Sequence, residues 1–571
     1  MTHPGRPGDV RSGAACACLA LAACLIAIYA TPNDAVWTVD CGAKALLAER
    51  FVDTSFSRLS LDYPAERYDP LGNAFPIPSP FAIRLGDAFV SHYPPAYPAT
   101  AAPFYALLGP AGLRLPAALG VAACAFLFAC WVAPVFGERR AFVGGLALAL
   151  ATPLFFYGVT IWEHSITVAL PLASVAALSR PKGARALLAG LLAGIACWYR
   201  EELVFMLPAL AAACLLCERT WRELAWLTLG AAIPGAGLAL FNTFAYGHPL
   251  GVHIEYNLHS SPPLAEILRD LGALASGMGA NPTEGALLAT SAAAAIGLAF
   301  LVARDDRRLP LAIIAATALG LAAWLRGTTA ISSATIPLVE MMRFNGFAVQ
   351  FPLVCLAGIG FARLRRTPKY APLRIGVLAG VAFLAFSLPF RVAFSDFSSG
   401  GHWGPRMLLP AAPALVALAL VAVDAVPDAS ARSRVVLRGV WVALVAAGLI
   451  SSVLAIRLLD HQKRESRALQ QRIAGVDAAV VVTNFPALGQ QLPELWRERP
   501  LLLVSDAAGF AGVARSLERE HIDEFLFVQG AHRRLRQRPG AACVLAGRHR
   551  GRHVARVFDV DLLRCRPHGP G

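Results

Sequence analysis

The feature that most constrains this chain of 571 residues is a series of apolar runs, most of them about 15–22 residues long. A helix needs roughly 20 apolar residues to cross the hydrocarbon core of a bilayer, so each run predicts a membrane span. Thirteen runs qualify: 13–30, 115–136, 141–159, 165–179, 186–199, 203–217, 224–245, 285–303, 309–325, 346–362, 375–391, 407–423 and 437–458. The first run follows Arg6 and Arg11 and continues through Ile28, which favours an uncleaved span over a signal peptide.

Composition supports a polytopic membrane protein. Hydrophobic residues make up 56% of the chain, charged residues make up only 15%, and the mean hydropathy is +0.55. Soluble proteins carry roughly a quarter charged residues, so a large soluble enzyme, a disordered chain and a nucleic-acid-binding protein are excluded. The sequence has no phosphate-binding loop or convincing nucleotide fingerprint, so ATP-driven work inside the cell is not indicated.

Basic residues between the runs predict the orientation of the chain. One set of connections holds 20 Lys and Arg residues, whereas the short connections of the opposite set hold six. Cytoplasmic connections are enriched in Lys and Arg, so we expect the N-terminus inside and the C-terminus outside. The formal net charge of +14 reflects this asymmetry rather than a polyanionic partner. We therefore expect a multi-pass protein of the plasma membrane, the bacterial inner membrane.

A long first outer loop, residues 32–113, is expected as part of a membrane domain that covers residues 1–458. Apolar residues at helical spacing from Val39 to Phe51 predict a helix that lies on the membrane. Further along the loop, the prolines of residues 93–98 predict an extended or turn-like segment, because successive prolines resist helix formation.

The hydrophilic residues 459–571 predict a small extracytoplasmic α/β domain. Strands are expected at four places, with helices between the first three: 478–484, 500–505, 524–529 and 552–562. Cys543 and Cys565 lie in this domain, where the compartment allows a disulfide, although the sequence gives no geometry for it. The predicted fold class is thus an all-α polytopic membrane protein of about 13 transmembrane helices, with a small C-terminal α/β domain.

Polar residues gather on the predicted outer side, where a charge near the bilayer is costly. Asp40, just beyond the first span, is a candidate general base. Alternatively, it is an acidic residue that stabilises a helix N-terminus, with Lys44 one turn further on. Glu163 and His164 lie in a very short outer turn. They either contribute to a substrate site or belong to a solvated turn anchored by Trp162.

Two arginines are candidates for binding a phosphate, whose oxygens match the shape of a guanidinium. Arg200 is followed by Glu201 and Glu202, so a local ion pair is the alternative interpretation. Arg406 follows His402 in a glycine-rich stretch, residues 398–410, at the mouth of a span, for which an ordinary interfacial loop is the alternative.

His92 and Tyr93 add to the polar residues of the first outer loop. Together with Glu163, His164, Arg200, Glu201, His402 and Arg406, they form the predicted substrate-binding set, and Asp40 is the predicted catalytic residue. A substrate site at the outer leaflet is therefore the hypothesis that the sequence favours.

Taken in order, these motifs resemble the GT-C superfamily of polytopic glycosyltransferases, particularly bacterial relatives of the protein mannosyltransferases and the lipid A aminoarabinose transferase. The resemblance rests on Asp40 in the large first outer loop and on six further stretches: 92–98, 102–109, 162–164, 198–202, 242–250 and 400–410. Each motif is loose, and their order and sidedness over nearly the whole membrane part give the specificity.

The resemblance implies transfer of a sugar from a polyprenyl-phosphate donor to an acceptor hydroxyl at the outer face, on an envelope lipid, glycan or protein. Asp40 would be the general base of an inverting reaction, and Arg200 and Arg406 would hold the donor phosphate. Glu163 and His164 would shape the donor or acceptor site.

Two questions stay open at this point. No Asp-x-Asp pair accompanies Asp40, so the sequence leaves a divalent metal cofactor undecided. The competing functions are a transporter or flippase of an envelope lipid or glycan precursor, and a non-catalytic scaffold. The broad first outer loop and the lack of a clear internal repeat favour a transferase.

Overall fold

The computed structural model describes most of the chain as two compact units. The described residues are 7–179, 183–252, 254, 309–332, 350–394, 405–424, 431–533, 535, 538, 540–551 and 558–567. The helical unit comprises the described residues within Met1–Ala27, Leu115–Ser333 and Val339–Ile456. The mixed unit comprises those within Ile28–Arg114 and Arg457–Gly571.

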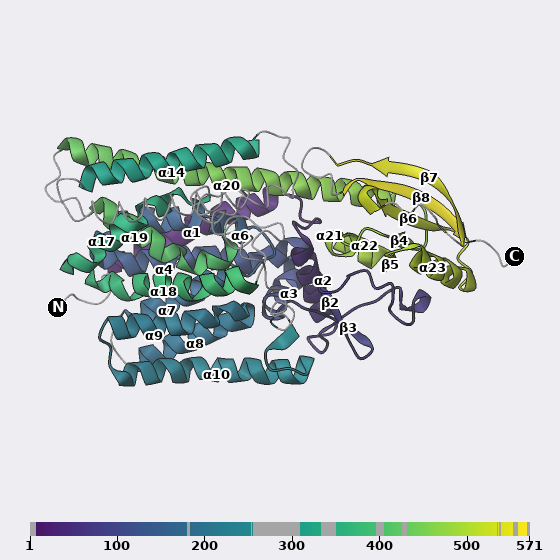
Figure 1. The fold of residues 1–571 in the computed structure, drawn as a ribbon, viewed down its shortest axis with the longest axis horizontal. Coiled ribbons are helices and arrows are strands. Elements are labelled where there is room, and N and C mark those ends of the chain that lie inside the picture. The colour runs from purple at the N-terminus through teal and green to yellow at the C-terminus, as the bar shows by residue number, and fades with distance from the viewer. Residues whose placement is uncertain are drawn as a thin grey trace. The chain divides into compact units, whose positions relative to one another are not determined.

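Helices make up the helical unit (Figure 1). In chain order they are α1 (Pro7–Ala30), α4 (Leu115–Phe136), α5 (Glu138–Leu150), α6 (Leu154–Gly158), α7 (Ile166–Leu178), α8 (Gly183–Tyr199), η3 (Glu201–Phe205), α9 (Met206–Leu216), α10 (Trp221–Tyr246), α14 (Leu309–Ser332), η4 (Pro352–Leu356), α17 (Ala357–Arg366), η5 (Pro368–Leu373), α18 (Arg374–Phe394), η6 (Arg406–Ala411), α19 (Ala412–Asp424) and α20 (Ala431–Ala474). The described parts of the predicted runs fall largely on these helices, whereas 285–303 and the first four residues of 346–362 lie outside the described residues.

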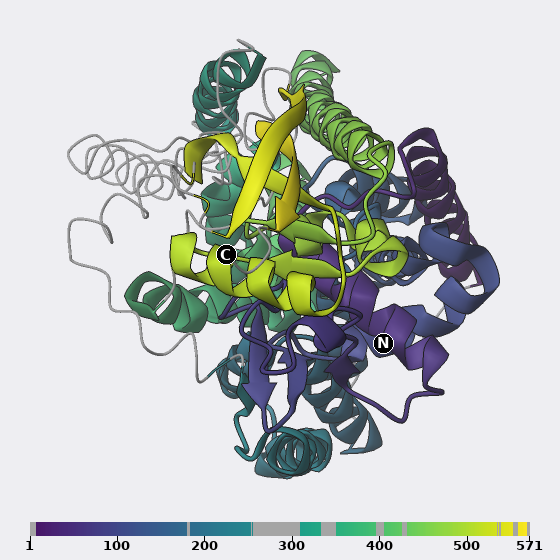
Figure 2. The same cartoon turned by 90° about the vertical axis from the view of Figure 1, so that its right-hand side faces the viewer.

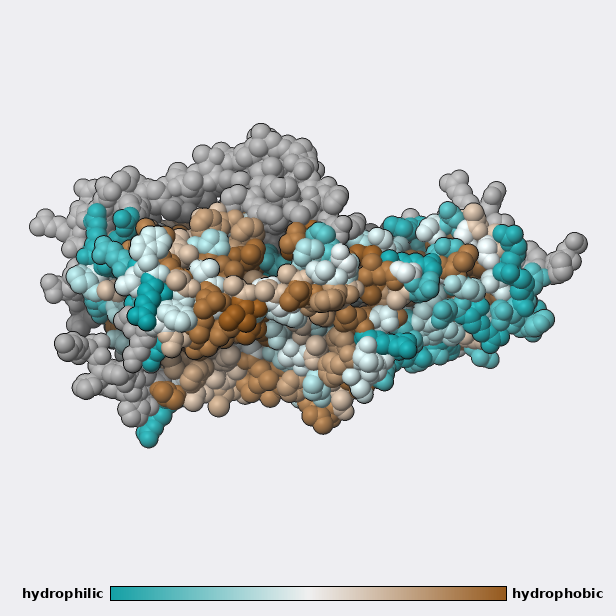
Figure 3. Space-filling view, turned by 90° about the horizontal axis from the view of Figure 1, so that it is seen from below, coloured by the Kyte–Doolittle hydropathy of each residue, from teal (hydrophilic) through white to brown (hydrophobic). Residues whose placement is uncertain are grey.

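Several of the helices can cross a membrane. Within the described residues, six helical stretches are long and apolar enough to do so: Val10–Ala30, Ala96–Phe136, Trp221–Tyr246, Pro368–Leu388, Arg406–Asp424 and Val435–Ala474. Their surfaces carry large apolar side chains such as Ile26, Phe244 and Val442, and Figure 3 shows broad apolar areas over the helices. The chain is therefore a multi-pass membrane protein, as predicted, while the number thirteen stays a prediction.

Two of the predicted spans differ from the helices observed. The run 141–159 contains two helices, because α5 ends at Leu150 and α6 begins only after Pro153, which has no N–H for a helical hydrogen bond. The last run was predicted to end at residue 458, but α20 continues without a break to Ala474. Polar residues can extend an apolar helix when packing supports them, so hydropathy alone marks the end of a span and not the end of its helix.

Small residues bring neighbouring helices close together. α8 packs against α10, where a Cβ atom on Gly190 would lie 2.1 Å from the carbonyl oxygen of Leu227. A Cβ atom on Gly230 would likewise lie 2.1 Å from the carbonyl oxygen of Leu187. Close approach of this kind strengthens van der Waals contact between helices in a bilayer, where the hydrophobic effect gives little help.

The first outer loop folds into α2 (Val39–Asp53), α3 (Ala96–Leu108), η1 (Glu66–Tyr68), η2 (Gly109–Arg114) and a three-stranded antiparallel sheet. The strands are β1 (Ser60–Leu61), β2 (Ala82–Leu85) and β3 (Ala88–Ser91), in the order β1-β3-β2. The helix predicted from Val39 to Phe51 is confirmed as α2. Residues 93–98 are only partly turn-like, because α3 begins at Ala96 and accepts Pro98 in its first turn, where a proline costs no hydrogen bond.

The C-terminal segment forms a five-stranded sheet in the order β5-β4-β6-β8-β7. Its elements are β4 (Val481–Thr483), α21 (Leu488–Gln491), α22 (Pro493–Glu498), β5 (Leu501–Leu503), α23 (Ala507–Arg519), β6 (Phe525–Gly530), η7 (Ala531–Arg533), β7 (Ala541–His549) and β8 (Val560–Pro567). β4 pairs in parallel with β5 and β6, whereas β8 is antiparallel to β6 and β7. The long β7–β8 pair stands out in yellow in Figure 2.

The three buried strands of the C-terminal segment, β4, β5 and β6, were predicted correctly. The edge strand β7 and the start of its neighbour β8 were not. β4, β5 and β6 lie within the expected ranges because they are short, continuous apolar runs. The fourth strand was predicted at 552–562, but β8 begins at Val560, and residues 552–557 lie outside the described residues. β7 was not predicted, although its first six residues are apolar, and most of its residues are exposed or half-buried.

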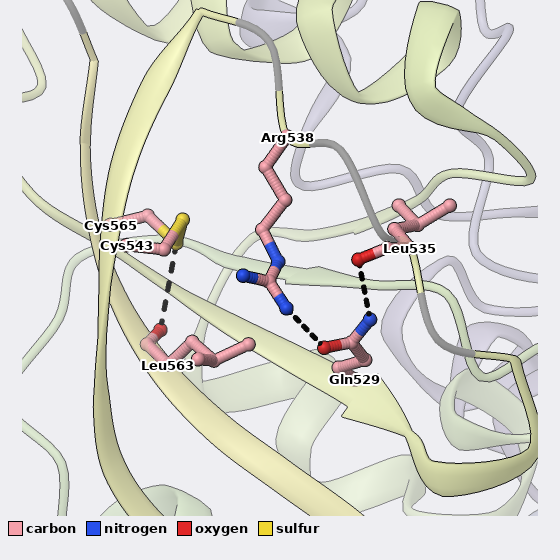
Figure 4. The surroundings of a disulfide bond; sticks show 6 residues. All are labelled: Gln529, Leu535, Arg538, Cys543, Leu563 and Cys565. Carbon is pink, nitrogen blue, oxygen red and sulfur yellow. Dashed lines mark hydrogen bonds between the residues drawn. A yellow bond between two sulfur atoms is a disulfide. The ribbon is translucent and has the colours of Figure 1, made fainter.

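A disulfide joins Cys543 on β7 to Cys565 on β8, and the two residues are opposite each other in the ladder (Figure 4). Beside it, the amide of Gln529 on β6 accepts a hydrogen bond of 2.7 Å from Arg538 and donates one of 3.3 Å to the carbonyl oxygen of Leu535. The disulfide and these bonds connect the edge strand to the centre of the sheet.

The first outer loop and the C-terminal segment share one hydrophobic core within the mixed unit. Leu46, Leu47 and Phe51 of α2 are buried in the same cluster as Leu495 and Trp496 from the C-terminal segment. The expectation that α2 lies on the membrane is therefore wrong. Its apolar residues are covered by protein, whereas an interfacial helix would present them to lipid.

Candidate functional site

The start of α2 is fixed by close contact with α21. A Cβ atom on Gly42 would lie 1.5 Å from the carbonyl oxygen of Gln490, so only glycine allows the two backbones to meet here. The side-chain amide of Gln491 donates hydrogen bonds of 3.2 Å to the carbonyl oxygens of Val36 and Trp37, just before the helix. The first turn of α2, which carries Asp40, is thus held by protein on several sides.

Two buried basic residues hold the segment that leads into α2. Arg114 donates hydrogen bonds of 3.2–3.3 Å to the carbonyl oxygens of Pro32, Asn33 and Ala35. Lys463 is 1% exposed and donates to the Thr31 hydroxyl at 3.4 Å, across 432 residues of sequence. The sequence interpretation missed both residues, because their partners are distant in the chain and nothing local indicates the contacts.

Asp40, His92 and Tyr93 come together in the mixed unit, as part of a group that we call the Asp40 cluster, which also includes Lys44. The Tyr93 hydroxyl donates a hydrogen bond of 2.5 Å to Oδ1 of Asp40. The ammonium of Lys44 lies 5.1 Å from the centre of the Tyr93 ring, and the His92 ring lies 3.9 Å from it. All four residues are buried, and Asp40 is the most exposed of them at 9%.

This arrangement suits a carboxylate that accepts a proton. An ionised carboxylate offers about four acceptor positions, and the Tyr93 hydroxyl uses one of them. The Tyr93 hydroxyl is a neutral donor, and its hydrogen bond orients the Asp40 carboxylate. The alternative role predicted for Asp40, stabilising the N-terminus of a helix, is compatible with its place in the first turn of α2.

Glu163 and Arg200 come together in the helical unit, as part of a group that we call the Arg200 cluster. Arg200 donates from Nη1 to Oε1 of Glu163 at 2.8 Å and from Nε to Oε1 of Glu202. Its Nη2 lies 2.9 Å from the sulfur of Met407. The side chains of Glu163, Arg200 and Glu202 are 2%, 9% and 8% exposed. Glu201 is also buried, in the first turn of η3.

Two carboxylates therefore occupy the guanidinium that was predicted to bind a phosphate. The alternative interpretation of Arg200, a local ion pair, is the arrangement observed. The local partner is Glu202, two residues away, and the distant one is Glu163, 37 residues away. A phosphate at Arg200 would have to replace a carboxylate, so the residue is better suited to position Glu163.

An aromatic layer adjoins the Arg200 cluster. His164 is 1% exposed and packs edge-on against Tyr157 and Trp162, with ring centres 4.5 and 5.7 Å apart. The guanidinium of Arg406 lies over the Trp162 ring, 5.3 Å from its centre, and Arg406 itself is partly exposed. His402, the remaining predicted residue, lies outside the described residues.

A further buried carboxyl lies on α2. Glu49 accepts a hydrogen bond of 2.7 Å from Nε of Arg497 and a second from its Nη2. Burial raises the pKa of Glu49 to about 7, and the guanidinium offsets only part of this effect. Glu49 is therefore a group that changes its charge near neutral pH.

No metal site is evident in the described part of the chain. Among these residues, no group of three or more His, Cys, Asp or Glu side chains could hold a metal ion.

The fold defines a multi-pass membrane protein in which the first outer loop and the C-terminal segment build a mixed α/β unit. Two crystal structures of ArnT from Cupriavidus metallidurans, one bound to undecaprenyl phosphate and one in the apo state, align with 96% of this chain and 97% of their own. Both are 13% identical to it, with TM-scores of 0.53 and 0.54. The fold that the predicted resemblance implies is confirmed by this likeness to ArnT.

A more distant likeness joins the chain to the archaeal oligosaccharyltransferase AglB from Archaeoglobus fulgidus, in complex with an inhibitory peptide and a dolichol-phosphate. That structure is 12% identical, aligns with 91% of this chain and 69% of its own, and has a TM-score of 0.47. No protein-family model matches the sequence, and no curated protein matches it.

Proposed function

We propose that the protein transfers a sugar from a polyprenyl-phosphate-linked donor to an acceptor hydroxyl at the outer face of the membrane. The observation that carries this proposal is the likeness, over 96% of the chain, to an ArnT structure that is bound to undecaprenyl phosphate. The basic asymmetry of the connections supports an outer location for the first loop and the C-terminal segment.

Asp40 is the general base in this proposal. As the acceptor oxygen attacks the anomeric carbon, its proton passes to the Asp40 carboxylate. The bond between the anomeric carbon and the phosphate oxygen breaks, and its electron pair leaves with the polyprenyl phosphate. Attack opposite the leaving group inverts the anomeric configuration. The hydrogen bond from Tyr93 supports this role because it fixes the carboxylate in one orientation.

Arg406 is the proposed contact for the donor phosphate, on which negative charge develops as the bond breaks. It is partly exposed, and its guanidinium lies over the Trp162 ring, 5.3 Å from the ring centre. Glu163 and His164 are proposed to shape the donor or acceptor site, with Arg200 and Glu201 holding them in place.

The substitution Asp40→Asn tests the proposal. Asn keeps the size of the side chain and accepts a hydrogen bond, but it cannot take up the acceptor proton. We expect sugar transfer to fall by about 10²-fold or more, with donor binding preserved. The assay measures release of polyprenyl phosphate from lipid-linked sugars by the purified full-length protein, with an envelope extract as acceptor.

The matched control is Asp53→Asn, which removes an exposed carboxylate from the same helix. Its turnover should equal that of the wild type. Transfer within a few-fold of wild type in Asp40→Asn would contradict the role of Asp40. If the wild-type protein moves lipid-linked sugars across vesicle membranes and releases no polyprenyl phosphate, a flippase replaces the transferase.

A further inference from the structure

A cavity of about 410 Å³ lies in the helical unit, and its described lining includes no residue of the Arg200 cluster. It is formed where the first turn of α5, the last turn of α19 and the beginning of α20 meet. Three arginines line it, Arg139, Arg140 and Arg438, together with an apolar wall that includes Trp441. The connections that carry these arginines belong to the basic set predicted to be cytoplasmic.

Among the described residues of the lining, the one carboxylate is that of Asp424, and it is already neutralised. It accepts hydrogen bonds from Lys369 Nζ at 2.6 Å and the Tyr370 hydroxyl at 2.9 Å, and it forms an ion pair with Arg140. Its side chain is 8% exposed. The lining therefore has an excess of positive charge, since three basic residues surround this single aspartate.

Arg139 and Arg438 provide that excess. Both are exposed, and within the part of the chain that the structure describes neither has a carboxylate within ion-pair distance. Guanidinium groups form charge-assisted, two-pronged hydrogen bonds with phosphate oxygens. Two of them at the rim of one cavity are suited to a single phosphate.

The apolar residues lie one helical turn deeper than the arginines. Val143 follows Arg139 by four residues on α5, and Val442 follows Arg438 by four residues on α20. Residues four apart lie on the same face of a helix, about 6 Å apart along its axis. α5 begins one residue before Arg139, and α20 begins seven residues before Arg438, so in both helices the arginine lies nearer the helix start than the apolar side chain.

α19 runs in the opposite direction, because it ends at the cavity. Its charged residue is again nearer the helix end at the cavity than its apolar residue. Asp424 is its last residue, and Leu420 lies one turn deeper. Three helices thus give one gradient, from a charged rim to an apolar wall. The gradient matches a molecule that has an anionic head and a hydrocarbon chain.

We propose that this cavity binds an anionic phospholipid of the inner leaflet. Arg139 and Arg438 hold the phosphate of the headgroup, and one acyl chain lies along Val143, Val442 and Trp441. Basic pockets between membrane helices on the cytoplasmic side suit such headgroups, and tryptophan favours the depth of the interface. The lipid fills the cavity between α5, α19 and α20, and it does not depend on the sugar transfer proposed above.

The test compares lipid retention by native mass spectrometry of the full-length protein in detergent, with phosphatidylglycerol or phosphatidylcholine added. The double variant Arg139→Gln/Arg438→Gln should retain phosphatidylglycerol about tenfold less well than the wild type, while the wild type should prefer phosphatidylglycerol over phosphatidylcholine. The matched control is Arg222→Gln/Arg365→Gln, which removes two exposed arginines from the same predicted side but outside the cavity. It should retain the lipid like the wild type.

A second variant keeps the test decisive if the double variant does not fold. Val143→Trp narrows the cavity without changing its charge, so it should also lower retention of phosphatidylglycerol. Equal retention of both lipids, an equal loss in the control variant, or full retention in Val143→Trp and the double variant would overturn the proposal. Displacement of the lipid by millimolar inorganic phosphate would show that the arginines bind free phosphate instead, which also overturns it.

Discussion

The Asp40 cluster and the Arg200 cluster are both buried, but the hydrogen bonds to their carboxylates come from different kinds of donor. Asp40 accepts a hydrogen bond from a neutral hydroxyl, that of Tyr93. Glu163 accepts from a guanidinium, which also binds Glu202. A carboxylate with a neutral partner keeps its charge available for chemistry, whereas an ion-paired carboxylate is stabilised in place.

The comparison shows that burial alone does not indicate the role of an acidic residue. Asp40 is 9% exposed and Glu163 is 2% exposed, so both pay for desolvation. The partner decides which of them can accept a proton at low cost. We therefore expect substitutions in the Asp40 cluster to affect turnover first, and substitutions in the Arg200 cluster to affect stability first.

Arg200→Gln should have the largest effect on stability. Removing the guanidinium breaks the two buried ion pairs that Arg200 forms with Glu163 and Glu202, and breaking a buried ion pair costs about 3–5 kcal/mol. Thermal unfolding in detergent measures the loss. Arg222→Gln, an exposed arginine on α10, is the control and should unfold like the wild type.

The comparison would fail if Arg200→Gln unfolded at the wild-type temperature while Asp40→Asn did not. In that case the ion pair would contribute little, and the Asp40 cluster would be the structural one. The double variant Arg200→Gln/Glu163→Gln should recover part of the stability, because it removes a charge that Arg200→Gln leaves uncompensated.

Tyr93→Phe should have an intermediate effect. It removes the hydroxyl that donates to Asp40, and a hydrogen bond to a charged group contributes about 1.5–3 kcal/mol. We expect turnover to fall about tenfold. Tyr97→Phe is the control, because the buried Tyr97 hydroxyl donates to the carbonyl oxygen of Leu113 at 2.9 Å in the same unit. Both variants should lose stability, but only Tyr93→Phe should lose turnover.

Equal turnover in the two tyrosine variants would mean that the Tyr93 hydroxyl does nothing for Asp40 beyond packing. The proposed orientation of the base by Tyr93 would then be wrong.

Glu49→Gln should have the smallest effect of these variants. Its effect on the free energy of unfolding should depend on pH. The raised pKa of about 7 means that folded Glu49 holds its proton more tightly than the unfolded chain does. The free energy of unfolding should therefore fall as the pH rises from about 4.5 to about 7, by an amount of order 1 kcal/mol. Glu49→Gln removes this dependence. Unfolding measured at several pH values checks it, with the exposed Glu498→Gln as the control that keeps the slope.

A slope that persists in Glu49→Gln would assign the titration to another group. A wild-type stability that rises over this pH range would show that the ion pair with Arg497 outweighs burial at Glu49.

Features that depend on local sequence were predicted well. The apolar runs became helices because a continuous apolar segment in a bilayer must satisfy its own backbone hydrogen bonds. The strands β4, β5 and β6 followed from short apolar runs, and α2 followed from helical spacing. Asp40, His92 and Tyr93 were also named from the sequence, Asp40 as the catalytic residue and the other two within the larger substrate-binding set.

Only the tertiary structure decided which partners the charged residues have. Glu202 near Arg200 was visible in the sequence, but Glu163 is 37 residues away from Arg200. Lys463 likewise donates a hydrogen bond to Thr31 across 432 residues. The same is true of α2, whose apolar side chains pack into a core with residues more than 400 positions later rather than onto lipid. A hydropathy pattern predicts that the apolar face of a helix must be covered. What covers it, and which charge meets which, depends on contacts that only the folded chain brings together.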